Sequence, residues 1–417
     1  YKSFAEPFIA NGPSPAALEA DRTLYAALWN AYTDEVEKVR KLPSGSLQQT
    51  IDTLPQSMAA AHGDAGKLAL ATHWADGLKT RDELRQLMIA KGIKDSEEKT
   101  FRQISFEDYL ARQKPRSNGD AVAVIVAEGE IRDGKAPAGA VGGLSTAKLI
   151  RTAREDNQIK AVVLRVNSPG GSAYASELIR RELELTRAAG KPVIVSMSNL
   201  AASGGYWVSL SADEVIADPT TVTGSIGVFA LFPTADRMMG KIGIHTNGVT
   251  TTWLADAQNP LRPLDPRFGA LIQSSVNHIY DDFTTKTAAA RKTTPQQIDA
   301  VAQGRVWTGQ QALEHGLVDR VGSYDDALQA AATRAKLGTD FRVAYLDPKP
   351  TGLDRWTQWL GFSATHLTHQ YLQSNLGPTG MLPDSARNIV DSLSWLSQLA
   401  DGHSTFLALT HCLCQAP

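Results

Sequence analysis

Small residues surround Ser203 in a pattern that suits a serine nucleophile. The run AASGGYW (201–207) begins four residues after the end of the apolar stretch Pro192–Met197. Small neighbours let a substrate backbone approach closely, and the first N–H groups of a helix can hold an oxyanion. We therefore predict that Ser203 attacks an acyl group, with the N–H of Gly204 as one oxyanion donor.

Two more loops of small residues lie nearby in the chain. NSPGGS (167–172) follows the apolar run Val162–Val166, and TGSIG (223–227) comes after the Ser203 loop. Neither apolar run alternates with polar residues, which indicates buried parallel strands, and ligands bind at the carboxyl ends of such strands. Glycine-rich loops can also serve only to reverse the chain. Three of them in succession favour a site, with Gly170 or Gly171 as the second oxyanion donor.

The base that would deprotonate Ser203 is not evident from the residues alone. None of the nine histidines lies in the three loops. His245 is the one histidine that we retain as a candidate, because it follows a strand-like segment in the same repeat as Ser203. A lysine can replace histidine only if loss of solvent lowers its pKa from about 10.4 toward neutrality.

Together, NSPGGS, AASGGYW, TGSIGV and the opening YKSFAEPF resemble the signal peptide peptidase A (protease IV) family of serine proteases. The resemblance covers nearly the whole chain. It implies an α/β fold of the Clp-protease/crotonase type and a catalytic pair of Ser203 and Lys2. It also implies that Ser225 hydrogen-bonds the lysine and orients it. Without the resemblance, Ser225 could equally be a turn serine that caps a helix.

An internal repeat organises the chain. ALEHGL (312–317) followed by YDDAL echoes ATHWADGL (71–78) followed by RDEL. We expect residues 1–110 to be the second half of an incomplete first copy, 111–120 a linker, 121–338 a complete second copy and 339–417 a tail. The position that matches Lys2 falls in 248–252, nearest Thr251, so the second copy has the serine without the lysine.

The spacing of apolar residues and the positions of proline and glycine predict the helices and strands that would position these residues. Helices are expected over 14–42, 145–155 and 266–291, with several more within 47–92 and a helix start at Thr294-Pro295. A strand is expected over 121–127, and 96–119 is interpreted as a polar linker. An amphipathic helix is expected over 386–399 in the tail.

Composition narrows the function classes. The formal net charge is −2, from 42 basic and 44 acidic residues, and there is no long basic run, which argues against nucleic-acid binding. No run of 18 apolar residues is present. His411, Cys412 and Cys414 are too few ligands for a zinc site, so no metal is expected. No cofactor is expected either, because NSPGG lacks the GK[ST] ending of a phosphate loop.

The resemblance also implies partners and a location. Peptide substrates, in particular remnants of cleaved signal peptides, would bind as extended strands. The parent protein would be a homo-oligomer, a tetramer, anchored in the bacterial inner membrane and facing the periplasm. Because the chain starts inside a motif at Tyr1, we expect the anchor to precede it. The alternatives are a Clp-like or acyl-CoA-processing enzyme, and a non-catalytic scaffold.

Overall fold

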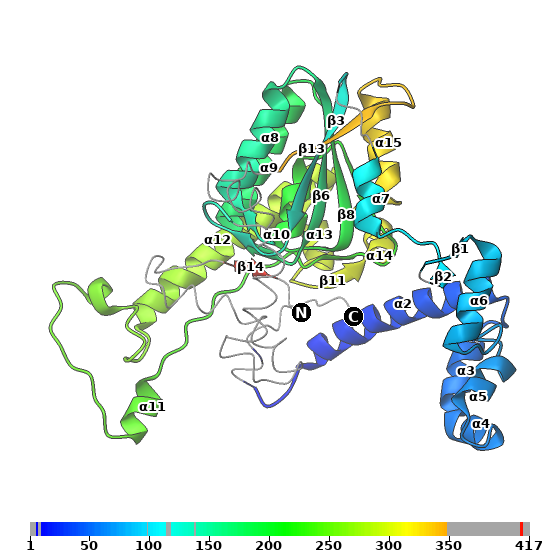
Figure 1. Ribbon diagram of the computed structural model, residues 1–417. Helices are drawn as coiled ribbons and strands as arrows, with labels where there is room; N and C mark the ends of the chain where they lie inside the picture. The colour runs from blue at the N-terminus through cyan, green and yellow to red at the C-terminus, as the bar shows by residue number, and fades with distance from the viewer. Residues whose placement is uncertain are drawn as a thin grey trace. The chain divides into compact units, whose positions relative to one another are not determined.

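The computed structural model describes residues 6, 10–97, 99–113, 118–136, 139–347 and 409–411 (Figure 1). These form two compact units. Unit 2 comprises Arg22–Asn118, and unit 1 comprises the described residues up to Asp21 and from Gly119 onward. Lys2, Cys412, Cys414 and the helix expected over 386–399 lie outside the described residues.

Unit 1 is built on a largely parallel sheet. Its main path runs β11 (Val306–Thr308), β10 (Val222–Gly224), β8 (Val193–Ala202), β6 (Ile159–Ser168), β3 (Ala121–Glu128) and β13 (Arg342–Tyr345). Of these neighbours only β10 and β11 are antiparallel. Strand β9 (Glu214–Ala217) also pairs with β8, and β12 (Arg320–Val321) pairs with β9. The expected parallel α/β sheet is confirmed, and β13 extends it past residue 338.

The central strands are apolar on both faces because helices cover both faces. Leu164 and Val195 belong to one core cluster with residues of α8 (Gly143–Glu155) and α9 (Ala173–Ala188). Val163 and Ile194 face the other way and pack with residues of α15 (Tyr324–Arg334). Figure 1 shows α8 and α9 on one side of the sheet and α15 on the other. A strand buried on both faces has no position that favours a polar residue.

Three more helices contribute residues to the core cluster that contains α8 and α9. They are α12 (Pro266–Arg291), α13 (Pro295–Val301) and α14 (Gly309–Glu314). The range expected for α12 from the sequence is observed. Thr294 caps α13 with a capping box to Gln297, which satisfies two N–H groups at the helix start. Three short helical segments precede α12 in the chain: η1 (Val208–Ser211), α11 (Asp236–Lys241) and η2 (Trp253–Asp256).

A small second sheet lies at the first glycine loop. Strand β7 (Gly170–Ser172) pairs in parallel with β4 (Ile131–Arg132), which pairs with β5 (Val141–Gly142). On its other side β7 pairs antiparallel with β14 (Leu409–His411). Within the described residues, no helix has both the length and the apolar character that crossing a membrane requires.

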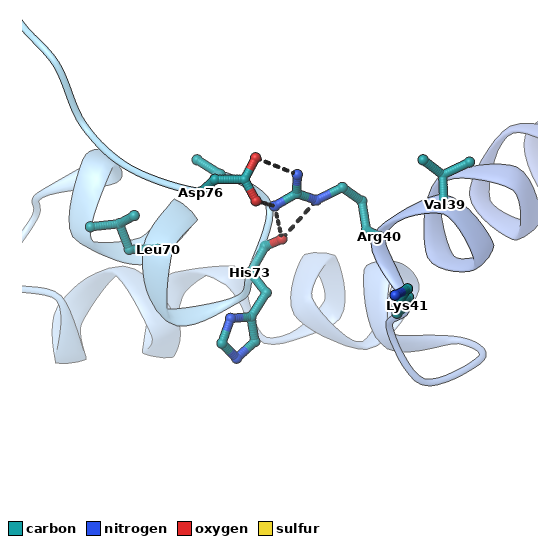
Figure 2. A pocket seen from close by; sticks show the side chains of 7 residues that line it. Val39, Arg40, Lys41, Leu70, His73 and Asp76 are labelled. Carbon is teal, nitrogen blue, oxygen red and sulfur yellow. Dashed lines mark hydrogen bonds and ion pairs between the residues drawn. The ribbon is translucent and has the colours of Figure 1, made fainter. Parts of the chain in front are cut away.

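Unit 2 is helical. It holds most of α2 (Pro15–Arg40), then α3 (Ser46–Asp52), α4 (Leu54–Ala60), α5 (Ala65–Ala71) and α6 (Arg81–Lys91). The hairpin of β1 (Lys94–Asp95) and β2 (Thr100–Phe101) and helix α7 (Phe106–Arg112) follow. Within 96–119, whose polar composition suggests a linker, the described residues therefore form β2 and α7. Arg40, the last residue of α2, donates to Asp76 and to the carbonyl of His73 (Figure 2).

Candidate active site

Ser203 occupies a sharp turn between a strand and a helix. It follows the end of β8 and is the N-cap of α10 (Gly204–Trp207), with φ +59° and ψ −116°. Such a backbone is rarely populated by residues other than glycine and costs about 1–3 kcal/mol, and strain of this kind clusters at active sites. The side chain of Ser203 is fully buried. The turn thus has the sharp, strained strand-to-helix geometry of a nucleophile elbow.

Strand register brings Ser225 beside Ser203. Strands β8 and β10 are parallel, and Ala202 is the partner of Gly224. Ser203 directly follows Ala202 and Ser225 directly follows Gly224. Because the strands are parallel, the two serines lie side by side at the carboxyl ends of β8 and β10. The N–H of Ser203 donates to the carbonyl of Gly224 at 2.8 Å, which fixes the two turns to each other. Ser225 also has a positive φ, +51°, and is 2% exposed.

The first glycine loop packs directly against the start of α10. A Cβ on Gly205 would lie 2.6 Å from the carbonyl oxygen of Ser168, and a Cβ on Gly171 would lie 2.0 Å from that of Ile131. Gly171 also has φ +146°, which L side chains rarely adopt. The Gly204 N–H is at the first position of α10, where no intrahelical carbonyl can accept it. The two candidate donor loops are therefore in contact.

The N–H of Gly170 has a partner in this structure. It donates to the hydroxyl of Ser168 at 3.1 Å, within the same loop. Ser172, which closes the loop, donates to Asp133 at 2.5 Å, and its hydroxyl oxygen accepts from the N–H of Ala175 at the start of α9. Asp133 thus fixes the loop to the segment after β4. Sequence reasoning missed Asp133, because its partner is 39 residues away and no local pattern joins them.

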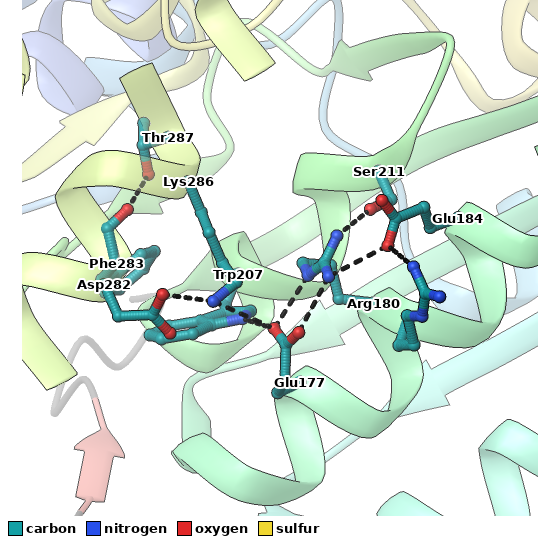
Figure 3. A network of polar contacts seen from close by, with 10 residues as sticks. Glu177, Arg180, Glu184, Trp207, Ser211, Asp282, Phe283, Lys286 and Thr287 are labelled. Carbon is teal, nitrogen blue, oxygen red and sulfur yellow. Dashed lines mark hydrogen bonds and ion pairs between the residues drawn. The ribbon is translucent and has the colours of Figure 1, made fainter. Parts of the chain in front are cut away.

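A partly buried polar network holds the segment that follows Ser203. Glu177 on α9 accepts from the indole of Trp207 at 2.8 Å and from Arg180, and Arg180 donates to Ser211 at 2.6 Å (Figure 3). Burial would raise the pKa of Glu177, but the donors Arg180 and Trp207 outweigh it and keep that pKa below its ordinary value. One helix therefore anchors both the end of α10 and the end of η1. The network escaped sequence analysis.

The chain is similar to known proteins. The profile of Peptidase family S49 matches residues 186–338, which include Ser203 and Ser225. The chain is 35% identical over 199 residues to "Putative protease slr0021" of Synechocystis, and the match covers 47% of the chain and 71% of that protein. The chain belongs to peptidase family S49.

A longer S49 relative matches most of the chain. It is "Protease 4" of Salmonella typhi, 43% identical over 354 residues, covering 85% of this chain and 57% of that protein. The chain therefore spans little more than half the length of this relative. Among solved structures, a mutant of the "1510-N membrane-bound stomatin-specific protease" aligns with 56% of this chain and 100% of its own, at 16% identity and a TM-score of 0.35.

The structure describes only one of the two candidate bases. Lys2 lies outside the described residues. His245 does not leave a strand, as its sequence suggested: it lies in an irregular exposed segment after α11. The apolar residues around it, which alternate weakly, have no neighbouring strand to pair with in the part of the chain that the structure describes. Among the residues that the structure describes, no group of His, Cys, Asp and Glu side chains is arranged to hold a metal ion.

Proposed function

We propose that this S49 member is a serine endopeptidase in which Ser203 is the nucleophile, Lys2 the base and Ser225 the residue that orients the lysine. The observation that carries the proposal is the strained turn of Ser203, placed by strand register beside Ser225. An acyl-transfer site needs a nucleophile, a base, an orienting group and oxyanion donors within a few ångströms. All except the base are among the described residues.

The chemistry follows from these roles. Neutral Lys2 takes the proton of Ser203 as its oxygen attacks the scissile carbonyl carbon. The resulting oxyanion is held by the N–H of Gly204 and one N–H of the Gly170-Gly171 pair, and each such donor is worth about 2.7–4 kcal/mol. The lysine then protonates the leaving amine, and water hydrolyses the acyl-enzyme by the same route. Neither a metal nor a cofactor takes part.

Internal duplication supports a base that comes from the first copy. Helices α2 and α12 both have 26 residues and begin with proline, at Pro15 and Pro266. Each ends in an arginine that forms an ion pair with a later aspartate: Arg40 with Asp76, and Arg291 with Asp319. Aligning these helices without gaps sets Lys2 opposite Trp253, two residues beyond the Thr251 expected from the sequence. With either alignment the second copy has no lysine at this position.

We propose apolar peptides, including remnants of cleaved signal peptides, as substrates. An extended substrate would pair with β7, next to the oxyanion donors. The antiparallel pairing of β7 with β14 supports this, because there the backbone edge of Gly170–Ser172 already accepts an extended segment. An ester of a short apolar peptide is therefore a suitable test substrate.

We further propose that the protein acts at the bacterial inner membrane, facing the periplasm, as a homotetramer. Membership of S49 and the resemblance of the opening motif to signal peptide peptidase A support this. Light scattering on the purified protein measures the assembly mass. Fractionation of cells separates membrane-bound from periplasmic and cytoplasmic protein. A monomeric or cytoplasmic protein would refute the corresponding half of the proposal.

The central experiment compares single variants of the protein expressed from its complete gene. Hydrolysis of the apolar peptide ester is measured for the wild type, Ser203→Ala, Lys2→Ala and His245→Ala. We expect Ser203→Ala and Lys2→Ala to lower kcat/KM by about 10⁴-fold or more, as loss of a nucleophile or its base does. His245→Ala should keep the wild-type rate, since this side chain is exposed on an irregular segment.

Each outcome separates the alternatives. Full activity of Lys2→Ala together with loss in His245→Ala would replace the lysine by histidine and favour a Clp-like enzyme. If Ser203→Ala kept its rate, the nucleophile would be wrong. Absence of hydrolysis by every protein on every peptide ester would favour the non-catalytic scaffold.

A further inference from the structure

Arg305 connects the Ser225 turn with helix α2. It directly precedes β11, and its carbonyl accepts the N–H of Ser225 at 2.7 Å. The neighbouring Gly304 N–H donates to the carbonyl of Ile226 at 2.9 Å. These bonds continue the antiparallel ladder of β10 and β11 by one step beyond Gly224. The backbone at Arg305 therefore determines where Ser225 sits.

The side chain of Arg305 reaches in another direction. Its Nη2 donates to Oε1 of Glu19 at 2.6 Å, across 286 positions of the sequence. The guanidinium carbon lies 4.4 Å from the ring centre of Trp307, which fixes the plane of the group. The side chain of Arg305 is only 14% exposed and that of Glu19 is 49% exposed. A pair with one largely buried partner is held more firmly than a surface pair.

Glu19 is joined in turn to the segment that carries the lysine motif. It lies in the first turns of α2, in the part of that helix that belongs to unit 1. Just before this helix, the carboxylate of Glu6 accepts the N–H of Ser14 at 2.8 Å, and the Ala10 N–H donates to the carbonyl of Glu6. Glu6 belongs to the same YKSFAEPF motif as Lys2. A chain of bonds therefore runs from this motif through α2 to the Ser225 turn.

We propose that the Glu19–Arg305 ion pair is a positioning device that sets the lysine-bearing segment in register with Ser203 and Ser225. The inference rests on the proposed function. Neither residue touches the reacting atoms, so both act through others: Glu19 through the start of α2, and Arg305 through Ser225. Because a displacement of about 1 Å can cost on the order of 10²-fold in rate, a single ion pair at this place is enough to control activity.

The test is a charge-reversal cycle in the protein expressed from its complete gene. Glu19→Arg and Arg305→Glu should each lower kcat/KM by about 10- to 100-fold, mainly through kcat. The double variant Glu19→Arg/Arg305→Glu restores the attraction with the charges exchanged and should recover most of the loss. Glu19→Gln keeps the side-chain length and should give a smaller fall in kcat. It is the control for the possibility that the charge-reversal variants fail to fold.

The pH profile distinguishes positioning from simple stabilisation. A lysine base acts only when neutral, so the rate rises with pH through the pKa of that lysine. If loss of the ion pair moves the lysine out of its working position, this rise should shift upward, toward the pKa of about 10.4 of a solvated lysine. A merely structural pair would leave the position of the rise unchanged. An unchanged rise with unchanged kcat/KM in Glu19→Arg and Arg305→Glu overturns the proposal.

A matched control comes from the opposite edge of the sheet. Arg187 pairs with Asp213 at 2.8 Å, just before β9, far from the carboxyl ends of the strands. Arg187→Glu should leave both kcat/KM and the pH profile as in the wild type. Ser203→Ala tells the two failures apart: if it is active, the proposed function fails. If it is inactive while both reversals keep full activity, only the positioning role fails.

Discussion

The two units contain the same local device in different surroundings. In unit 1, Arg291 at the end of α12 pairs with Asp319 at 3.1 Å and its side chain is 7% exposed. In unit 2, Arg40 at the end of α2 pairs with Asp76 at 2.9 Å; there the arginine is 26% and the carboxylate 89% exposed, against 7% and 47% in unit 1. Arg291 also interacts with the Tyr206 hydroxyl, three residues after Ser203. The buried copy thus supports the active-site helix, whereas the exposed copy only closes a helix end.

Removal of the buried arginine should have the largest effect. Arg291→Ala leaves the Tyr206 hydroxyl and the Asp319 carboxylate without their cation and should destabilise unit 1 by about 3 kcal/mol, the lower end for a broken buried pair because Asp319 can still be hydrated. Hydrogen exchange of the β8 and β10 amides, read by mass spectrometry, measures this. Protection in unit 2 should not change. Equal loss of protection in both units would refute the contrast.

The Tyr206 hydroxyl should contribute less to the stability of unit 1 than Arg291 does. It donates to the carbonyl of Leu317 at 2.8 Å and is fully buried. Tyr206→Phe leaves that carbonyl unsatisfied, which should cost about 1–2 kcal/mol in the free energy of unfolding of unit 1. Denaturant unfolding gives the value, and Tyr174→Phe, at a tyrosine that is 65% exposed, is the control. A Tyr206→Phe protein as stable as this control would show that the bond adds nothing.

The exposed copy should matter least for stability. Arg40 donates two N–H groups to the His73 carbonyl as well as to Asp76, so Arg40→Ala removes bonds as well as charge. Water can replace these partners, so we expect the smallest loss of stability of the three variants, confined to unit 2. Hydrogen exchange of α2 and α5 measures it. A loss as large as that of Arg291→Ala would mean that burial does not separate the two pairs.

Acid should act on unit 1 through Glu177. Since its folded-state pKa lies below the unfolded value of about 4.3, its contribution is complete above that pH and is lost as the pH falls through the folded pKa. Glu177→Gln should therefore lower stability at pH 7 and make the decline between about pH 4.3 and the folded pKa shallower. Unfolding midpoints across this range test it. Glu155→Gln, at an exposed residue ending α8, should keep the wild-type slope.

Much of the architecture was predictable because its signals are local. Apolar runs without alternation mark β6 and β8, and Pro266 with its Asp265 cap marks the start of α12. The small residues after each strand mark the Ser203 and Ser225 turns. The interpretation of 96–119 as a linker missed β2 and α7, because α7 spans only seven residues and buries none of them, so no apolar periodicity marks it.

The sequence by itself determined which residues could do chemistry, because small residues and helix caps act on their own neighbours. Only the tertiary structure decided which of them meet. The parallel register of β8 and β10 puts Ser203 beside Ser225, and no local pattern encodes register between strands. Arg305 and Glu19 meet for the same reason: an ion pair depends on distance in space, and the fold alone sets that distance.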